Sequence, residues 1–236
     1  MSLLTDVRNE LRMCGSPEKA HFLQRFFKTG PGQYAEGDVF IGVTVPQTRK
    51  IAKKYRHLTE TECSELLKSE IHEERLLGLL ICVGHFEKGD EQTKESVYRF
   101  YCRHMQYVNN WDLVDLSAER IVGAYLFTRD RTALYNLAQS DILWERRIAI
   151  IATFHFIKNG CFDDTIAIAQ LLCNDRQDLI HKAVGWMLRE MGKRNELLLE
   201  SFIRTHYSAM PRTMLRYAIE KFPEPKRKQF LCGKWD

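Results

Sequence analysis

The sequence predicts an all-α protein in which helical hairpins stack into one curved solenoid. Nearly every segment longer than ten residues carries apolar residues at the 3.6-residue period of a helix, and strand-like alternation is almost absent. The breaks between these segments are short and contain Gly, Asp, Asn or Pro. Four strongly apolar helices begin near positions 75, 111, 147 and 183, a constant spacing of 36 residues that is typical of stacked helical repeats. We therefore expect about a dozen helices in a stacked α-solenoid, forming a single domain over residues 1–236.

Individual helices are marked by their capping residues and by their apolar period. Ser16 and Pro17 provide an N-cap and a proline at the first helical position, and Gly30 is expected to end this helix. Thr59 and Glu62 have the spacing of a capping box. Apolar periodicity then predicts helices over these segments: 70–87, 91–107, 111–127, 131–139, 142–158, 163–173, 178–191, 195–208 and 211–222.

One long irregular stretch interrupts this pattern. Residues 29–46 read "TGPGQYAEGDVFIGVTVP", and their glycines and prolines exclude a continuous helix. The apolar run "VFIGV" within it is expected either to form a short extended piece or simply to anchor the loop to the core.

Composition excludes several protein classes. Hydrophobic residues make up 44% and charged residues 28% of the chain, and no apolar run approaches the roughly 18 residues of a membrane span. Asp6 and Glu10 interrupt the apolar start, which is therefore not a signal peptide, and we expect an intracellular, cytoplasmic protein. The seven cysteines form no CxxC pair and lack a His partner pattern, so reduced, mostly buried thiols are expected and no metal site.

Positive charge is concentrated in two parts of the chain. The net charge is only +4, but residues 175–236 contain 13 Lys/Arg against 8 Asp/Glu, and residues 49–56 read "RKIAKKYR". Such patches suit an anionic partner such as nucleic acid, although solvated helix faces carry them too.

Two tryptophans share helix faces with charged residues. Trp111 and Asp115 lie four residues apart, and Lys182, Trp186 and Arg189 occupy positions i, i+4 and i+7. A tryptophan at helical spacing is usually part of the core, but a stripe that faced only the core would not carry two cations. The repeat places the starts of equivalent helices on one concave surface. The residues expected there are Trp111, Asp115, Arg147, Lys182, Trp186 and Arg189.

These stretches resemble the AlkD family of DNA alkylation repair glycosylases. The resemblance is carried by "NNWDLVDLSA", "LWERRIAII" and "HKAVGWMLRE", with weaker support from "FIGVTVPQTRK", and it covers roughly residues 16–222. It implies a HEAT-like solenoid that cradles duplex DNA and excises positively charged N3- and N7-alkylated purines by cleaving the N-glycosidic bond. No cofactor or metal is implied, and the protein is expected to work as a monomer on DNA that contains alkylated purines.

The resemblance also assigns roles to particular residues. Asp115 is expected to stabilise the oxocarbenium-like sugar and to orient a water molecule, while Trp111 and Trp186 wall the deoxyribose. The predicted DNA contacts come from four further residues: Arg147, Lys182, Arg189 and Phe26. The family leaves the lesion stacked in the duplex, so no snug base pocket is expected.

The chain departs from the family pattern at three places. Asn110 stands where many members have a further tryptophan, Phe26 stands where some have a tyrosine, and the loop at 29–38 is longer. Two alternatives to a glycosylase therefore stay open. One is a non-catalytic solenoid that binds bent or branched DNA, and the other is a solenoid that binds a peptide. The sequence shows no GxGxxG, P-loop or GxSxG motif that would indicate another enzyme class.

Overall fold

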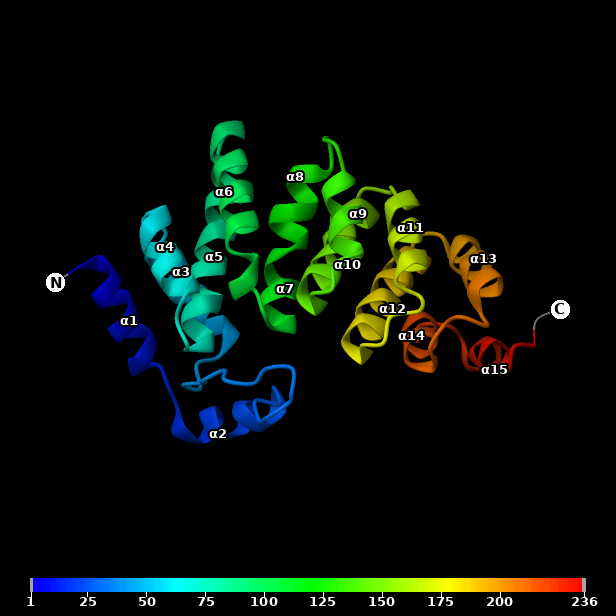
Figure 1. Cartoon of the computed structure of the whole chain (residues 1–236), viewed down its shortest axis with the longest axis horizontal. Helices are drawn as coiled ribbons and strands as arrows, with labels where there is room; N and C mark the ends of the chain where they lie inside the picture. The colour runs from blue at the N-terminus through cyan, green and yellow to red at the C-terminus, as the bar shows by residue number, and fades with distance from the viewer. Residues whose placement is uncertain (1, 235–236) are drawn as a thin grey trace. The chain divides into compact units, whose positions relative to one another are not determined.

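The computed structural model describes residues 2–234, and these residues form helices joined by short turns (Figure 1). Within that range there is no β-strand, only an isolated parallel bridge between Val39 and Ile71. The predicted all-α fold class is confirmed. The chain divides into two compact units, residues 1–117 and 118–236, and each is described by itself. A single domain over the whole chain stays a prediction.

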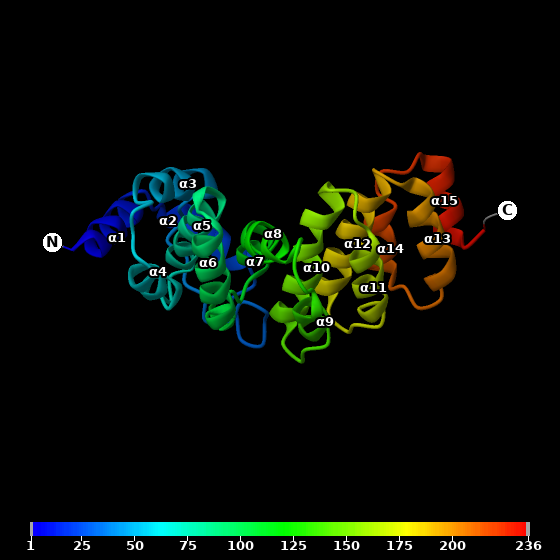
Figure 2. The same ribbon diagram turned by 90° about the horizontal axis from the view of Figure 1, so that it is seen from above.

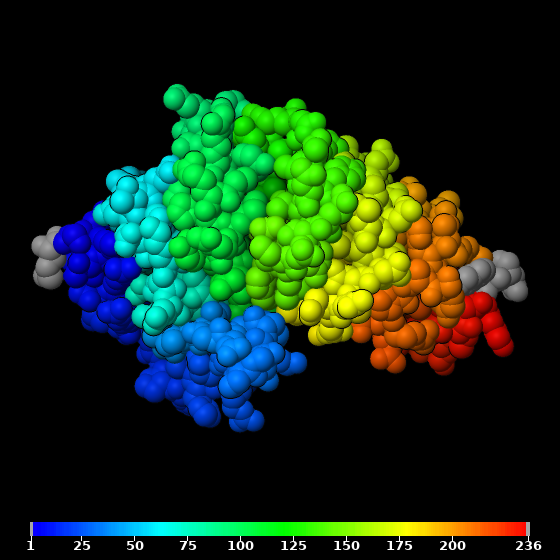
Figure 3. Space-filling view, viewed as in Figure 1, coloured from blue at the N-terminus to red at the C-terminus, as the bar shows by residue number. Residues whose placement is uncertain are grey.

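The first unit is built around α5 (His72–Lys88), which is buried along almost its whole length. Its apolar residues point in all directions because helices α3, α4, α6 and α7 pack around it. Helix α2 and the long segment after it lie at the end of the unit where α5 and α7 begin (Figure 1), and they stand out at its surface there (Figure 3). The other elements of this unit are α1 (Leu3–Met13), α2 (Pro17–Phe26), α3 (Val45–Lys54), α4 (Glu60–Leu67), α6 (Glu91–Arg103), η1 (Met105–Tyr107) and α7 (Trp111–Ser117).

The second unit stacks helices in two layers (Figure 2). One layer contains α10 (Leu143–Lys158), α12 (Asp178–Gly192) and α14 (Arg212–Ala218), which pack side by side. Gly185 permits the close contact between α12 and α14, because a Cβ there would lie 2.5 Å from the Met214 carbonyl oxygen. The remaining elements are η2 (Glu119–Gly123), α8 (Ala124–Leu126), α9 (Thr132–Ala138), α11 (Asp163–Leu171), α13 (Glu196–His206) and α15 (Glu224–Cys232).

The capping predictions are confirmed, but one helix end was wrong. The Ser16 side chain accepts a hydrogen bond from the Lys19 amide, and Thr59 and Glu62 form the capping box. The helix that begins after Ser16 ends at Phe26, not at Gly30, because the next side chain, Phe27, turns into the core and Lys28 takes a left-handed φ of 54°.

The predicted helix over 111–127 is three pieces instead of one, which corrects that prediction. A π-helical turn, η2, follows α7, and the Gly123 amide donates to the Ala118 carbonyl five residues back. A Cβ on Gly123 would lie 2.1 Å from the Ala152 carbonyl oxygen of α10, so this turn is built for close helix packing. The segment 91–107 likewise divides into α6 and η1. Helices α1, α3 and α15 lie outside the segments predicted by periodicity.

The cysteines are all free thiols, but the expectation that most are buried was wrong. Only Cys63, Cys82 and Cys173 are buried, whereas Cys102 and Cys232 are exposed because they stand on outward faces near the ends of α6 and α15. Among residues 2–234, none of the helices has the length and apolar character needed to cross a membrane.

Candidate active site

Trp111 begins helix α7, and its neighbour Asn110 caps that helix. The Trp111 amide donates to the Asn110 side-chain oxygen at 2.8 Å, and the Val114 amide donates to the Asn110 carbonyl oxygen at 3.1 Å. Asp115 follows Trp111 by one turn, and both side chains are half-buried. The polar side chain at Asn110 therefore has a structural function, since it starts the helix that carries both predicted catalytic residues.

The indole of Trp111 is held by aromatic side chains from α2 and from the segment that follows it. Its ring stacks on Phe27 with a centroid distance of 5.0 Å and an angle of 8°, and Phe26 meets it edge-on at 6.1 Å. The indole nitrogen donates a hydrogen bond of 3.2 Å to the hydroxyl of Tyr34. Phe26 is 54% exposed, so this predicted DNA-contacting side chain lies at the surface beside Trp111.

A buried network of charges underlies this aromatic cluster. His72 lies between two carboxylates, with Nδ1 3.1 Å from Asp38 and Nε2 2.8 Å from Asp112. Arg75 donates to the other oxygen of Asp38 at 2.5 Å, and the Asn110 amide donates to Asp38 at 2.9 Å. None of these five side chains is more than about a tenth exposed. Because both imidazole nitrogens face carboxylate oxygens, His72 donates from both and is a cation.

The pKa values of the network agree with this geometry. Burial by itself would lower the pKa of His72, but the charge of Asp112 and hydrogen bonds to Asp112 and Asp38 raise it to about 9, against the opposing charge of Arg75. Burial would also raise the pKa of Asp38, yet the hydrogen bond from His72, the charge of Arg75 and the hydrogen bond from Asn110 lower it. Two cations thus balance two carboxylates, and the buried cluster has no net charge near neutral pH.

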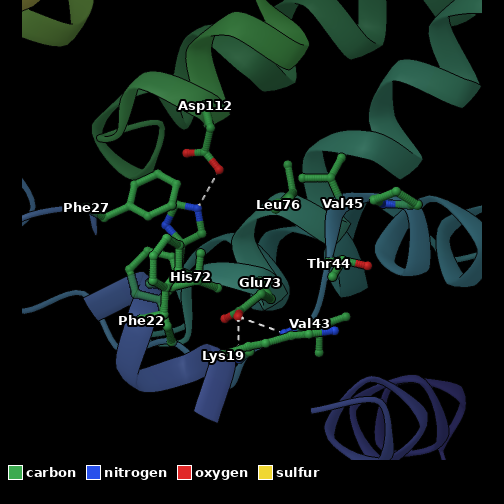
Figure 4. A pocket seen from close by; sticks show the side chains of 14 residues that line it. Lys19, Phe22, Phe27, Val43, Thr44, Val45, His72, Glu73, Leu76 and Asp112 are labelled. Carbon is green, nitrogen blue, oxygen red and sulfur yellow. Dashed lines mark hydrogen bonds and ion pairs between the residues drawn. The ribbon is translucent and has the colours of Figure 1, made fainter. Parts of the chain in front are cut away.

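A pocket of about 420 Å³ opens beside the network within the first unit (Figure 4). Phe22, Phe27 and Phe40 line it together with aliphatic side chains, and His72 and Asp112 form part of its wall. Since His72 and Asp112 already bond to each other, the pocket offers mainly apolar surface.

Two residues after Asp115, Ser117 joins α7 to α6. Tyr101, which is 1% exposed, donates to or accepts from Ser117 at 3.0 Å. Burial raises the pKa of Tyr101, the hydrogen bond with Ser117 opposes this increase, and the charge of Asp115 adds a smaller increase.

In the second unit, Arg147 stands in the first turns of α10. It is only 4% exposed, and one guanidinium nitrogen donates at 2.6 Å to the Leu179 carbonyl oxygen at the start of α12. The starts of these two helices are therefore adjacent, as the 36-residue repeat predicts. Trp186 of α12 is half-buried, with its ring centroid 5.9 Å from that of Phe154.

The two cations that flank Trp186 on α12 differ in their surroundings. The Lys182 side chain is 40% exposed and bridges to Asp178 at 2.7 Å. The Arg189 side chain is 17% exposed and pairs with Glu220, with Glu190 at 3.5 Å. Lys182 is thus the more accessible of the two to an external anion.

Comparison with known proteins places the sequence of this chain in a family. The sequence profile of a family described as "DNA alkylation repair enzyme" matches residues 7–222. The chain belongs to this DNA alkylation repair family. Membership establishes a role in the repair of alkylation damage, with DNA as the partner.

A solved structure supports the fold of this alkylation repair family member. It is described as "Predicted DNA alkylation repair enzyme from Enterococcus faecalis" and matches with a TM-score of 0.68 at 15% identity, covering 89% of this chain and 97% of that chain. At this identity the likeness shows the fold alone. No curated protein matches the chain.

The structure divides the seven residues that sequence analysis singled out into two groups. Phe26, Trp111 and Asp115 lie in the first unit, and Arg147, Lys182, Trp186 and Arg189 lie in the second. Their roles in the DNA alkylation repair reaction stay predictions. Among the described residues, no cluster of three or more His, Cys, Asp or Glu could hold a metal ion.

Sequence reasoning missed four residues that surround Trp111 in this repair protein. They are Tyr34, Asp38, His72 and Asp112. His72 is a buried structural residue, and nothing in its spacing indicated two carboxylate partners. The available signal was weak: the long irregular stretch carries Tyr34 and Asp38, but no spacing relates them to α7.

Proposed function

We propose that this protein is a monofunctional DNA glycosylase that hydrolyses the N-glycosidic bond of N3- and N7-alkylated purines in duplex DNA. The observation that carries the proposal is the pairing of Trp111 and Asp115 one turn apart at the start of α7, both half-buried, with the exposed Phe26 packed edge-on against Trp111. This arrangement offers an aromatic surface and a carboxylate to the same ligand. Family membership supports DNA repair as the context.

The proposed reaction needs a carboxylate to stabilise positive charge on the sugar, and it needs no general acid to protonate the leaving base. An alkylated purine is a cation, so when the C1′–N bond breaks its electron pair neutralises the base, which leaves without being protonated. The sugar becomes oxocarbenium-like, water adds to C1′, and the water gives up one proton. Asp115 would stabilise the sugar cation and accept that proton, and Trp111 would pack against the deoxyribose.

The second unit would supply DNA contacts, an assignment that rests on the resemblance. Trp186 would provide a second aromatic wall, and Arg147, Lys182 and Arg189 would contact phosphates. Phe26 would add an apolar contact to the DNA in place of a hydroxyl. The protein would act as a monomer and without a cofactor.

The decisive experiment measures base release. Wild-type protein is expected to release N7-methylguanine from duplex DNA and to leave alkali-sensitive abasic sites. The control is the same duplex without the lesion, which should stay intact. Binding of the duplex without any release, at protein in excess over DNA, would favour the non-catalytic DNA-binding alternative and overturn the proposal.

DNA affinity is expected to be mainly electrostatic, because Lys and Arg contacts to phosphates release counterions. Lys182→Ala should weaken binding to all sequences and reduce the slope of log Kd against log salt by about 1. Lys94→Ala is a matched control, because Lys94 also pairs with a carboxylate, Glu91 at 2.9 Å, but lies on α6. Fluorescence anisotropy over a salt series measures Kd and its salt slope for each variant. Equal slopes for the two variants would contradict a phosphate contact at Lys182.

A further inference from the structure

The segment between α2 and α3 is long, irregular and firmly attached at its base. The Gln24 side chain donates to Thr29 and to the Asp38 carbonyl oxygen, and it accepts from the Phe40 amide at 2.8 Å. Farther on, the buried Glu73 carboxylate accepts the amides of residues 41–43 at 2.8 to 3.2 Å. The segment therefore has a defined conformation even though it contains no regular element.

Gly42 shows how closely this segment is packed. Its φ is 82°, and a Cβ at this position would lie 2.1 Å from the Ser16 carbonyl oxygen. No other residue fits here without moving the backbone. The conformation is thus specified by the sequence as well as by its anchors.

Asp38 is the anchor that joins the segment to the helices of the candidate site. Its carboxylate receives hydrogen bonds from Arg75 and His72 of α5 and from Asn110, the cap of α7. It is 6% exposed. Losing one partner from a buried, fully bonded group is costly, so the segment is held in one position relative to the start of α7.

Tyr34 is the residue that this anchored segment presents to Trp111. It stands four residues before Asp38, and its neighbour Ala35 is buried in the same cluster as Phe27 and Phe40. Its hydroxyl accepts the only N–H of the Trp111 indole, at 3.2 Å. Stacking on Phe27 fixes the plane of the Trp111 indole, and this hydrogen bond fixes the direction in which its nitrogen edge points.

We propose that Tyr34 is a positioning residue that fixes the orientation of the Trp111 indole for contact with damaged DNA. The inference rests on the proposed function for its catalytic consequence, but the orientation itself is a property of the free protein. On this inference, the function of the long segment is to place the Tyr34 hydroxyl against Trp111, which lies 77 positions away in the sequence.

The test replaces only the hydroxyl. In Tyr34→Phe the ring remains and the hydrogen bond from the Trp111 indole is lost, so the single-turnover excision rate is expected to fall about fivefold, while Kd for duplex DNA changes less than about twofold. Tyr55→Phe is the matched control, because the Tyr55 hydroxyl also donates one hydrogen bond in the first unit, to Glu10 at 2.8 Å, away from Trp111. The control should retain the wild-type rate.

A second measurement does not depend on activity. The indole N–H resonance of Trp111 is identified in a ¹⁵N-correlated NMR spectrum by its loss in Trp111→Phe. In Tyr34→Phe this resonance should move upfield and exchange faster with solvent, and in Tyr55→Phe it should stay in place.

The outcomes separate this inference from the proposed function. A moved resonance together with a slower rate in Tyr34→Phe alone supports it. An unmoved resonance overturns it, and so does a moved resonance with an unchanged rate in an active enzyme. If the wild-type protein releases no base, the proposed function fails. In that case a moved resonance together with a changed Kd for duplex DNA in Tyr34→Phe would show that Tyr34 positions Trp111 for binding, and an unchanged Kd would overturn the inference.

Discussion

Asp115→Asn is expected to lower the single-turnover rate of base excision by at least about tenfold, the change that about 1.4 kcal/mol in the barrier produces. The substitution keeps the size of the side chain and removes its charge. In the proposed reaction that charge stabilises the sugar cation in a half-buried position, where water screens it less than at an open surface. The variant should bind duplex DNA at least as tightly as wild type, because a carboxylate repels phosphates.

Three measurements on Asp115→Asn separate a catalytic from a structural role. They are single-turnover kinetics on DNA containing N7-methylguanine, Kd for the same duplex, and a thermal melt. Asp141→Asn makes the same change in net charge at an exposed position and should match wild type in all three. A lower melting temperature together with weaker binding would indicate a structural role for Asp115, and full activity in a normally folded variant would exclude it from catalysis.

The buried His72 should make the stability of the protein fall as the solution becomes alkaline. Its pKa is raised from 6.5 to about 9 in the folded protein, so the proton is bound more tightly in the folded than in the unfolded state. The stabilisation is fully present below pH 6.5 and is lost as the pH rises through about 9. Its size follows from the difference between the two pKa values and is about 3 kcal/mol.

The physical cause of this loss is an unbalanced buried charge. Without its proton, His72 leaves the carboxylates of Asp38 and Asp112 opposed only by Arg75, and one buried hydrogen bond loses its donor. In His72→Gln that imbalance exists at every pH. The variant should therefore be less stable than wild type near pH 6.5 and should lose little more between pH 6.5 and 9.5.

Urea unfolding at a series of pH values measures this difference. His57→Gln is the control, because His57 is exposed, and its pH profile should follow that of wild type. The imidazole proton shifts of His72 provide a direct check, with a midpoint expected near pH 9. A midpoint near 6.5, or equal pH profiles for wild type and His72→Gln, would contradict a doubly bonded imidazolium.

Much of the helical structure could be predicted because its determinants are local. The 3.6-residue apolar period located α9 to α14 to within a few residues but missed α15, and Ser16 and Thr59 marked helix starts through their own side chains. The period failed where packing changed the backbone, as at the π turn that ends at Gly123. It also failed at the end of α2, where burial of Phe27 stopped the helix early.

The candidate catalytic residues were visible for the same reason. Trp111 and Asp115 lie one helical turn apart, and a spacing of four residues places two side chains on the same face of a helix whatever the tertiary structure. The spacing of Lys182, Trp186 and Arg189 is of the same kind. This spacing did not show that Glu220 would pair with Arg189, because that carboxylate lies 31 residues further along the chain, just after α14.

The sequence by itself therefore determined an all-α chain, most of its helices and the pairing of an indole with a carboxylate at the start of one of them. Only the tertiary structure decided what surrounds that indole. Tyr34 reaches Trp111 across 77 positions, and Asp38 reaches Asn110 across 72. Helix period and capping depend on residues within about one turn of each other, and so they appear in the sequence as spacings. Hydrogen bonds made by an irregular segment have no such period, because the backbone between their partners is positioned by the packing of the whole unit.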